Sequence, residues 1–223
     1  MLFIDSVADG FASERIGYNG DGGKWICNGY KISKDEPWVV YGFGVGDDIS
    51  FDEGMAKQFS CETHLFDPAP SVVNNYAELE NNTPCGKGSL TFHPWGIGPI
   101  TDNPSDRMTL VLEDTQCEVK TLDQIAQLLG HSTIDIIKMD IEGGEFMVFK
   151  DFFENSLLEK YNTKIVLVEF HLLDDHGLSD LSGIILELIK HDFILYRKEI
   201  NPYSASSCAE FVFARNDFLL LPD

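Results

Sequence analysis

The feature that most constrains the fold is an alternation between short apolar runs and longer stretches with helical periodicity. Several runs are continuous in Val, Ile, Leu and Phe, which is typical of strands covered on both faces in a parallel sheet. Alternation of such strands with helices predicts a doubly wound α/β sheet. The strands are predicted at Trp38–Gly44, Thr63–Phe66, Leu90–His93, Ile134–Met139, Lys164–Phe170, Phe193–Lys198 and Glu210–Ala214.

Three of the intervening stretches carry helix signals. Ser50–Glu53 and Thr121–Gln124 both have the capping-box pattern, in which a hydroxyl residue is followed three positions later by Glu or Gln. Gly130 is the expected C-terminal stop of the second helix. A third stretch has apolar residues at i, i+3, i+4, i+7 and i+8, which predicts a helix buried along one stripe. The residues of that stripe are Leu181, Ile184, Ile185, Leu188 and Ile189.

The chain is predicted to form a single domain over residues 1–223, and this domain could be part of a longer chain. Residues 1–37 are expected to form an irregular lead-in, and residues 38–216 the sheet and its helices. Only Asn201–Ser207 separates the last two strands, which is too short for a crossover helix and predicts an antiparallel pair. Met108–Leu112 and Glu118–Lys120 are expected to form a small hairpin.

Charge and cysteine usage limit the partners and the compartment. The chain has 37 Asp and Glu against 16 Lys and Arg, a formal net charge of −21. Few cations are therefore available for phosphates, which disfavours nucleic acid and anionic membrane surfaces as partners. No apolar run approaches the ~18 residues of a membrane span, and no signal peptide is recognised. Five scattered cysteines favour a reducing, cytoplasmic setting.

A glycine turn closes the first predicted strand with Gly42, Gly44 and Gly46. Such a turn before a helix lets backbone amides approach a ligand. A dinucleotide fingerprint needs a small third residue, whereas Asp47 stands there, so the spacing favours a nucleoside that carries an amino acid. Asp67 follows the next strand, 21 residues after Gly46, where nucleoside sites place a carboxylate for the ribose hydroxyls. The alternative is a tight turn with an acid that only caps a helix.

Further polar side chains are predicted at the ends of two neighbouring strands. Asp140 follows Ile134–Met139, and alternation places Glu169 and His171 on one face at the end of the next strand. These three side chains are expected to converge at the ligand edge of the sheet. The structural alternatives are a solvated helix start for Asp140, a buried hydrogen bond for Glu169 and a satisfied strand-end polar group for His171.

The motifs together resemble the FkbM-type methyltransferases, in the branch that has an Arg-x-Gly and Asp-Gly-Gly lead-in. The resemblance extends from about Arg15 to Ala214. It implies a Rossmann-like class I S-adenosylmethionine fold with a seven-stranded, mostly parallel sheet whose last strand is antiparallel. It also implies O-methylation, often of a sugar, glycan or deoxysugar hydroxyl. The matching segments are Arg15–Gly17, Asp21–Trp25, Gly42–Asp47, Ser50–Phe51, Phe66–Pro68, Phe92–Gly96 and Ile137–Glu145.

Asp47 is an acid placed where the cationic sulfonium donor needs one, so it is a candidate contact of S-adenosylmethionine. On this resemblance, four more residues are candidate contacts. Asp21 is expected to fold over the carboxylate end of the cofactor or over the acceptor, and Pro68 adjoins the ribose acid. Trp95 and Gly96 are expected to face the adenine. The alternatives are a plain turn at Asp21 and a core tryptophan at Trp95.

Two chemistries fit a weakly acidic sugar hydroxyl. In the first, His171 is the general base and a carboxylate orients it. In the second, Asp140, Glu169 and His171 bind Mg²⁺ or Mn²⁺, which polarises the hydroxyl. Full activity in EDTA would exclude the metal alternative.

The remaining histidines are interpreted as structural. His64 is a strand residue, and His131 and His191 lie near helix ends. His176, in a loop, is either structural or on the acceptor side.

Two rival functions are an NAD-type oxidoreductase on a similar sheet and a non-catalytic glycan- or protein-binding module of the same fold. Asp47 disfavours the first. Nucleic-acid methylation is disfavoured by the charge and by the lack of an Asn/Asp-Pro-Pro-Tyr/Phe motif.

Overall fold

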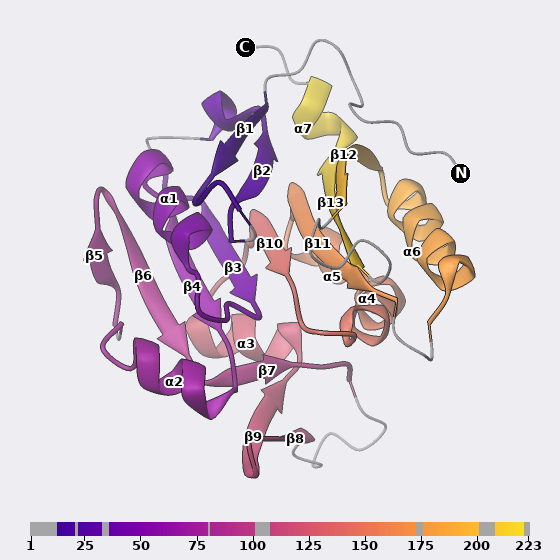
Figure 1. Cartoon of the computed structure of the whole chain (residues 1–223). Coiled ribbons are helices and arrows are strands. Elements are labelled where there is room, and N and C mark those ends of the chain that lie inside the picture. The colour runs from indigo at the N-terminus through magenta and orange to yellow at the C-terminus, as the bar shows by residue number, and fades with distance from the viewer. Residues whose placement is uncertain are drawn as a thin grey trace.

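A central eight-stranded sheet organises the protein (Figure 1). The computed structural model describes residues 13–20, 22–32, 36–79, 81–100, 108–172, 176–200 and 208–220. From one edge to the other the strands are β12 (Phe193–Ile200), β13 (Cys208–Arg215), β11 (Ile165–His171), β10 (Ile136–Met139), β3 (Val39–Phe43), β4 (Glu62–Phe66), β6 (Gly88–His93) and β5 (Thr83–Cys85). All seven predicted strands are present.

The direction of the strands confirms most of the predicted topology. The five strands β11, β10, β3, β4 and β6 are mutually parallel. The last strand, β13, is antiparallel to both of its neighbours, as predicted. The prediction of seven strands is one too few, because β5 adds an antiparallel edge. This strand has three residues with Pro84 at its centre, which is tolerated at an edge but produces no apolar run.

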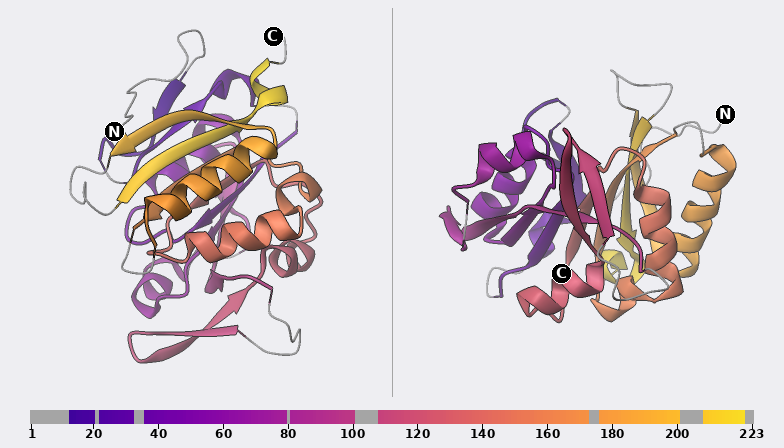
Figure 2. Two further views of the ribbon diagram at one scale, coloured as in Figure 1. Left: turned by 90° about the vertical axis from the view of Figure 1, so that its right-hand side faces the viewer. Right: turned by 90° about the horizontal axis from the view of Figure 1, so that it is seen from below.

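Helices cover both faces of the sheet (Figure 2). The elements α3, α4, α5 and α6 contribute to one apolar cluster, and α1 and α7 contribute to the cluster on the other face. α2 packs with part of α1 in a third cluster. The helices are α1 (Ser50–Phe59), α2 (Pro70–Tyr76), α3 (Leu122–Leu129), α4 (Glu145–Glu154), α5 (Leu157–Lys160), α6 (Leu178–Lys190) and α7 (Asn216–Leu220).

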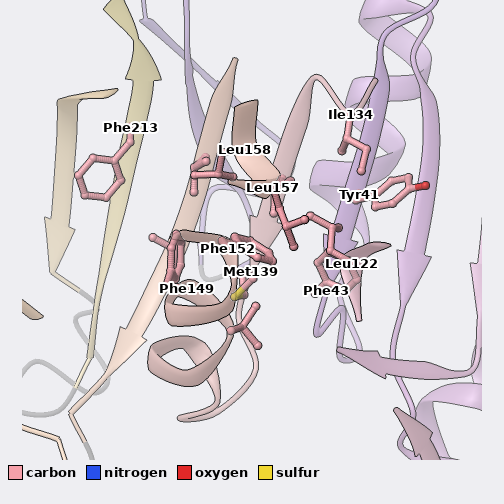
Figure 3. Packing of buried hydrophobic residues seen from close by; sticks show 14 of the residues in the cluster. Tyr41, Phe43, Leu122, Ile134, Met139, Phe149, Phe152, Leu157, Leu158 and Phe213 are labelled. Atoms are coloured by element: carbon pink, nitrogen blue, oxygen red, sulfur yellow. The ribbon is translucent and has the colours of Figure 1, made fainter. Parts of the chain in front are cut away.

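The larger cluster joins the central strands to α4 (Figure 3). Met139 of β10 and Phe149 and Phe152 of α4 are buried there together. Phe149 also lies edge-on to Phe152, with ring centroids 5.6 Å apart. Close packing of this kind fixes α4, and therefore the loop that connects β10 to it, relative to the sheet.

The helix signals are confirmed in part. Thr121 and Gln124 form the predicted capping box of α3, which ends at Gly130 with φ of +77°. The capping box at Ser50 is wrong: Ser50 lies inside α1, and its backbone amide donates to Asp48. Its hydroxyl instead accepts a hydrogen bond from the Tyr18 amide at 2.8 Å. In α6 the stripe is shorter than predicted, because Ile189 is exposed.

The lead-in is more ordered than predicted. It contains the antiparallel strands β1 (Ser13–Ile16) and β2 (Lys24–Cys27), followed by a short 3₁₀ helix at Gly29–Lys31. The expectation of an irregular 1–37 segment is therefore wrong for this part. Ile16 and Ile26 are buried in the same cluster as Phe51 of α1, so apolar burial stabilises the hairpin.

A small second sheet lies beyond the carboxyl end of β6. It consists of β7 (Trp95–Ile97), β9 (Thr115–Lys120) and β8 (Met108–Leu112). β8 and β9 form the predicted hairpin, and β7 pairs with β9 in parallel. Within the described ranges, none of the helices combines the length and apolarity that a membrane crossing requires.

Candidate functional site

A cleft of about 570 Å³ lies at the carboxyl ends of β3, β4 and β10. This is the edge at which open α/β sheets bind ligands. The volume is in the usual range of small-molecule sites. Its lining comes from Tyr18–Gly20, Gly22 and Lys24 of the lead-in, the glycine turn at 44–48, Asp67, Lys138, Asp140 and Glu142.

The glycine turn is packed directly against the end of β10. Gly44 has φ of +69°, and a Cβ built there would lie 1.7 Å from the Asp140 carbonyl oxygen. Lys138 Nζ donates to the Gly44 carbonyl at 2.9 Å. A Cβ on Gly42 would lie 2.5 Å from a carboxylate oxygen of Asp52, beneath the turn. Gly46 has φ of +54° and open space around it. The turn therefore requires glycine at 44 for close approach.

Asp67 connects β4 to the turn. One carboxylate oxygen accepts from the Gly46 amide at 3.2 Å, and the other accepts from the Ala69 amide at 2.9 Å. Ala69 is the N-cap of α2, and α2 has no side-chain capping hydrogen bond, so Asp67 forms a local turn before the helix rather than its cap. The side chain also lines the cleft. A carboxylate has about four lone-pair sites, so two backbone contacts leave capacity for ligand hydroxyls.

Of the other candidate cofactor contacts in the described residues, one lines the cleft and three do not. Asp47 lines the cleft beside the turn, whereas Pro68, Trp95 and Gly96 do not belong to its lining. Trp95 stacks on His93 with ring centroids 4.8 Å apart, which fits the core alternative. Pro68 packs near Gly96, where a built Cβ would lie 3.3 Å from the proline Cγ.

Asp21 lies outside the described residues, but its neighbours Gly20 and Gly22 line the cleft.

The structure brings Asp140, Glu169 and His171 together, as the strand order predicts. His171 Nε2 lies 3.9 Å from an Asp140 oxygen. Lys24 Nζ lies 3.9 Å from the other Asp140 oxygen and 3.6 Å from a Glu169 oxygen. Lys24 also forms an ion pair with Glu210, which faces Glu169 across the β11–β13 pairing.

Lys24 and Glu210 are site residues that the sequence reasoning missed. Burial lowers the pKa of Lys24, but the charges of Glu210, Asp140 and Glu169 outweigh burial and raise it. Burial raises the pKa of Glu210 to about 7 and also raises that of Asp140, although nearby lysines oppose both shifts. The only sequence signal for Lys24 was its place directly after the Asp-Gly-Gly string.

His171 has a second buried partner, Glu145, the first residue of α4. Their Nδ1 and Oε1 atoms are 3.0 Å apart. Glu145 is fully buried, and the backbone amides of Ile141 and Gly143 donate to its carboxylate at 3.0–3.3 Å. The loop after β10 thus fixes a carboxylate that orients the imidazole. Sequence reasoning placed Glu145 in a motif without pairing it with His171.

This pairing changes the charge state of His171. Burial alone would lower its pKa, but the Glu145 hydrogen bond and the charges of Glu145, Asp140 and Glu142 raise it to about 9. Glu142 Oε2 lies 3.5 Å from Nε2, yet that side chain is 84% exposed, so water screens it. The raised pKa favours the protonated imidazole at neutral pH.

Two groups of possible metal ligands share His171. One contains Asp140, Glu142 and His171, and the other contains Glu169, His171 and Cys208. In each group the ligand atoms lie within 4.8 Å of one another. The first group offers two carboxylates that line the cleft and the buried imidazole beside them, a donor set that suits Mn²⁺ or Mg²⁺. It uses Glu142 in the place predicted for Glu169. Neither His171 nor Glu169 belongs to the lining of the cleft itself.

Comparison with known families identifies the class of protein that carries this cleft. The family model described as "Methyltransferase domain" matches residues 2–215. The chain belongs to this methyltransferase family. The predicted α/β methyltransferase fold, with a mostly parallel sheet and helices on both faces, is confirmed. The cleft at the glycine turn is thus the candidate active site of a methyltransferase domain.

Two curated relatives are similar to part of this methyltransferase domain. "Probable methyltransferase-like protein 24" of Homo sapiens is 27% identical over 133 residues, which are 59% of this chain and 32% of the relative. The Rattus norvegicus protein of the same name is 26% identical over 133 residues, or 59% and 33%. The match thus spans about a third of the length of these relatives.

Solved structures with a similar chain trace include the N-terminal domain of human METTL16 in complex with SAH. It is 11% identical, with a TM-score of 0.49, and the match covers 83% of this chain and 64% of that one. Magnesium protoporphyrin IX methyltransferase from Synechocystis with bound SAM is 13% identical, with a TM-score of 0.48 and coverage of 82% and 72%. At these identities the similarity concerns the fold alone.

Proposed function

We propose that this methyltransferase domain transfers a methyl group from S-adenosylmethionine to a hydroxyl oxygen of a sugar or glycan. The observation that carries the proposal is the cleft, which is lined by the glycine turn, Asp67 and Asp140, with the His171 imidazole 3.9 Å behind Asp140. The acceptor class rests on the resemblance of the motifs to FkbM-type enzymes.

The electrostatics of the cleft support a cationic donor. Its lining has more carboxylates than ammonium groups. The carboxylates are those of Asp47, Asp48, Asp67, Asp140 and Glu142, and the ammonium groups are those of Lys24 and Lys138. S-adenosylmethionine carries a sulfonium and an ammonium group, and carboxylates nearby favour both. The Asp67 carboxylate, held beside the turn by Gly46, is the expected partner of the ribose hydroxyls.

The bound donor supplies a methyl group that is already activated for in-line displacement. The protein therefore contributes alignment and removal of the acceptor proton. With a pKa of about 9, His171 accepts that proton efficiently only at alkaline pH. At neutral pH, a divalent ion on Asp140, Glu142 and His171 is the alternative means of activating the hydroxyl. The two alternatives predict different behaviour in chelator.

Ligand binding tests the donor. Thermal shifts with S-adenosylmethionine, S-adenosylhomocysteine and NAD should show stabilisation by the first two. Stabilisation by NAD alone would instead support an oxidoreductase.

Turnover with a panel of sugar and glycan acceptors tests the reaction. Asp140→Ala should abolish turnover while donor binding persists, and equal turnover in this variant would remove Asp140 from the chemistry. Donor binding without turnover of any acceptor would support the non-catalytic module. Activity that survives EDTA would leave His171 as the base, whereas loss that Mn²⁺ or Mg²⁺ restores would support the metal.

Nucleic acid stays disfavoured as an acceptor because of the −21 charge. A cytoplasmic location stays a prediction from the cysteine pattern.

A further inference from the structure

A second cluster of ionisable side chains lies at the amino end of β4, whereas the cleft lies at the carboxyl ends of the strands. Glu62 is the first residue of β4, whereas Asp67 follows the end of that strand. Around Glu62 are His64, from the same strand, and His131, from the connection between α3 and β10. The proposed methyl transfer uses none of the three residues.

Three potential ligand atoms converge in this cluster. Glu62 Oε1 lies 3.2 Å from His64 Nε2 and 3.5 Å from His131 Nε2. All three atoms lie within 4.8 Å of one another. Zinc–ligand bonds of about 2.0–2.1 Å at tetrahedral angles separate the ligand atoms by about 3.3–3.4 Å. Both separations from Glu62 Oε1 are therefore close to those of a tetrahedral site. The 3.2 Å separation also suits a hydrogen bond to His64, whereas 3.5 Å is long for a direct hydrogen bond to His131.

The far side of each imidazole is also held. His64 Nδ1 lies 3.0 Å from His93 Nε2, and His131 Nδ1 lies 2.7 Å from the Tyr41 hydroxyl. Histidines that bind metals in proteins use their second ring nitrogen for such an outer hydrogen bond, which fixes the ring and the tautomer. Both rings are thereby oriented with Nε2 toward the same carboxylate.

The cluster is buried at its base and open on one side. The side chain of His64 is 5% exposed, that of His131 13% and that of Glu62 34%. The open side lets an ion enter and leaves a coordination position for water.

We infer that Glu62, His64 and His131 bind a zinc ion. Two imidazoles and one carboxylate form a donor set that zinc accepts readily, whereas Mg²⁺ and Ca²⁺ prefer oxygen ligands. Bound there, the ion would join β4 to the segment that leads from α3 into β10. This zinc ion would be separate from the divalent ion proposed for Asp140, Glu142 and His171, because none of the three zinc ligands lines the cleft.

Zinc titration of the full chain, in competition with a chromogenic chelator, tests the inference. The wild type should bind Zn²⁺ at this site. His131→Ala should lose this equivalent, and Glu62→Gln should weaken binding by at least about tenfold. Tyr41→Phe, which removes only the outer hydrogen bond of His131, should weaken it by about 10- to 100-fold.

The control is His191→Ala. His191 is also paired with a glutamate, Glu159, but has no second histidine beside it among the described residues. The His191→Ala variant should bind zinc like the wild type. A His171→Ala variant separates the two sites. If His171→Ala lost zinc binding while His131→Ala and Glu62→Gln retained it, the ion would be bound near His171 and the inference would be overturned.

Thermal unfolding gives an independent measurement. Zinc at about 100 times its Kd should raise the Tm of the wild type by about 5–10 °C. Glu62→Gln removes a partly exposed carboxylate and should fold, so a reduced rise in this variant reports binding rather than misfolding. An equal rise in wild type and Glu62→Gln would contradict the assignment.

Discussion

Replacement of Glu145 by Gln should change the charge state of His171. The neutral amide removes the charge that faces Nδ1 from 3.0 Å inside the protein. The pKa of His171 lies at about 9, against an ordinary value of 6.5, a difference worth about 3 kcal/mol between the two protonation states. Because Glu145 supplies the largest of the influences that raise it, we expect the pKa to fall by more than one unit in Glu145→Gln.

The assay is a pH titration of the histidine ring signals by NMR. Glu142→Gln is the matched control, because it removes a carboxylate of the same type 3.5 Å from the other ring nitrogen. Since Glu142 is exposed, we expect a shift of less than about half a unit. Equal shifts in the two variants, or none in Glu145→Gln, would refute the argument that the buried pair controls His171.

The same pair predicts how stability depends on pH. A histidine whose pKa is raised by folding stabilises the protein fully below its unfolded value, near 6.5, and this contribution is lost as the pH rises through about 9. Denaturant unfolding of the wild type should therefore show a decline across that window. Glu145→Gln should show a smaller decline, and an identical slope would count against the pairing.

Three further changes test other parts of the structure. Burial raises the pKa of Asp52 to about 6, so its ionisation opposes folding as the pH rises from about 4 to 6. Asp52→Asn should therefore raise the free energy of unfolding by up to about 3 kcal/mol at pH 8, with little difference at pH 4, in urea titrations. Gly44→Ala should weaken S-adenosylmethionine binding at least tenfold in calorimetry, because its Cβ would overlap the Asp140 carbonyl; unchanged affinity would contradict the turn geometry. Phe149→Ala should cost about 3–5 kcal/mol in the same urea titrations, since the ring is fully buried.

The parts of the fold that could be predicted from the sequence are those buried on both faces. Continuous apolar runs such as residues 165–168 of β11 identify a strand without any tertiary information. The lead-in hairpin could not be predicted in this way, because Ser13–Ile16 and Lys24–Cys27 are short and mix polar with apolar residues. Their burial comes from tertiary packing, in which β1 contacts α1 and β2 contacts β13.

The candidate site likewise contains residues whose position could be predicted from the sequence and contacts that could not. Asp67, Asp140 and Glu169 could be placed at one edge because each follows or ends a parallel strand. The contact between Glu145 and His171 depends on how the loop after β10 folds back over β11, and no local pattern encodes that. Lys24 likewise reaches Glu210 across 186 residues of sequence.

The lead-in also has a consequence for where this domain begins. Tyr18–Gly20, Gly22 and Lys24 form one wall of the cleft, and the hydroxyl of Ser50 and the carboxylate of Glu210 hold that wall in place. A fragment that starts at Trp38 would keep every strand of the central sheet. It would nevertheless lack this wall of the cleft. The carboxylates of Asp140, Glu169 and Glu210 would also lose the ammonium group of Lys24. The domain boundary suggested by the sheet therefore differs from the boundary that the site requires.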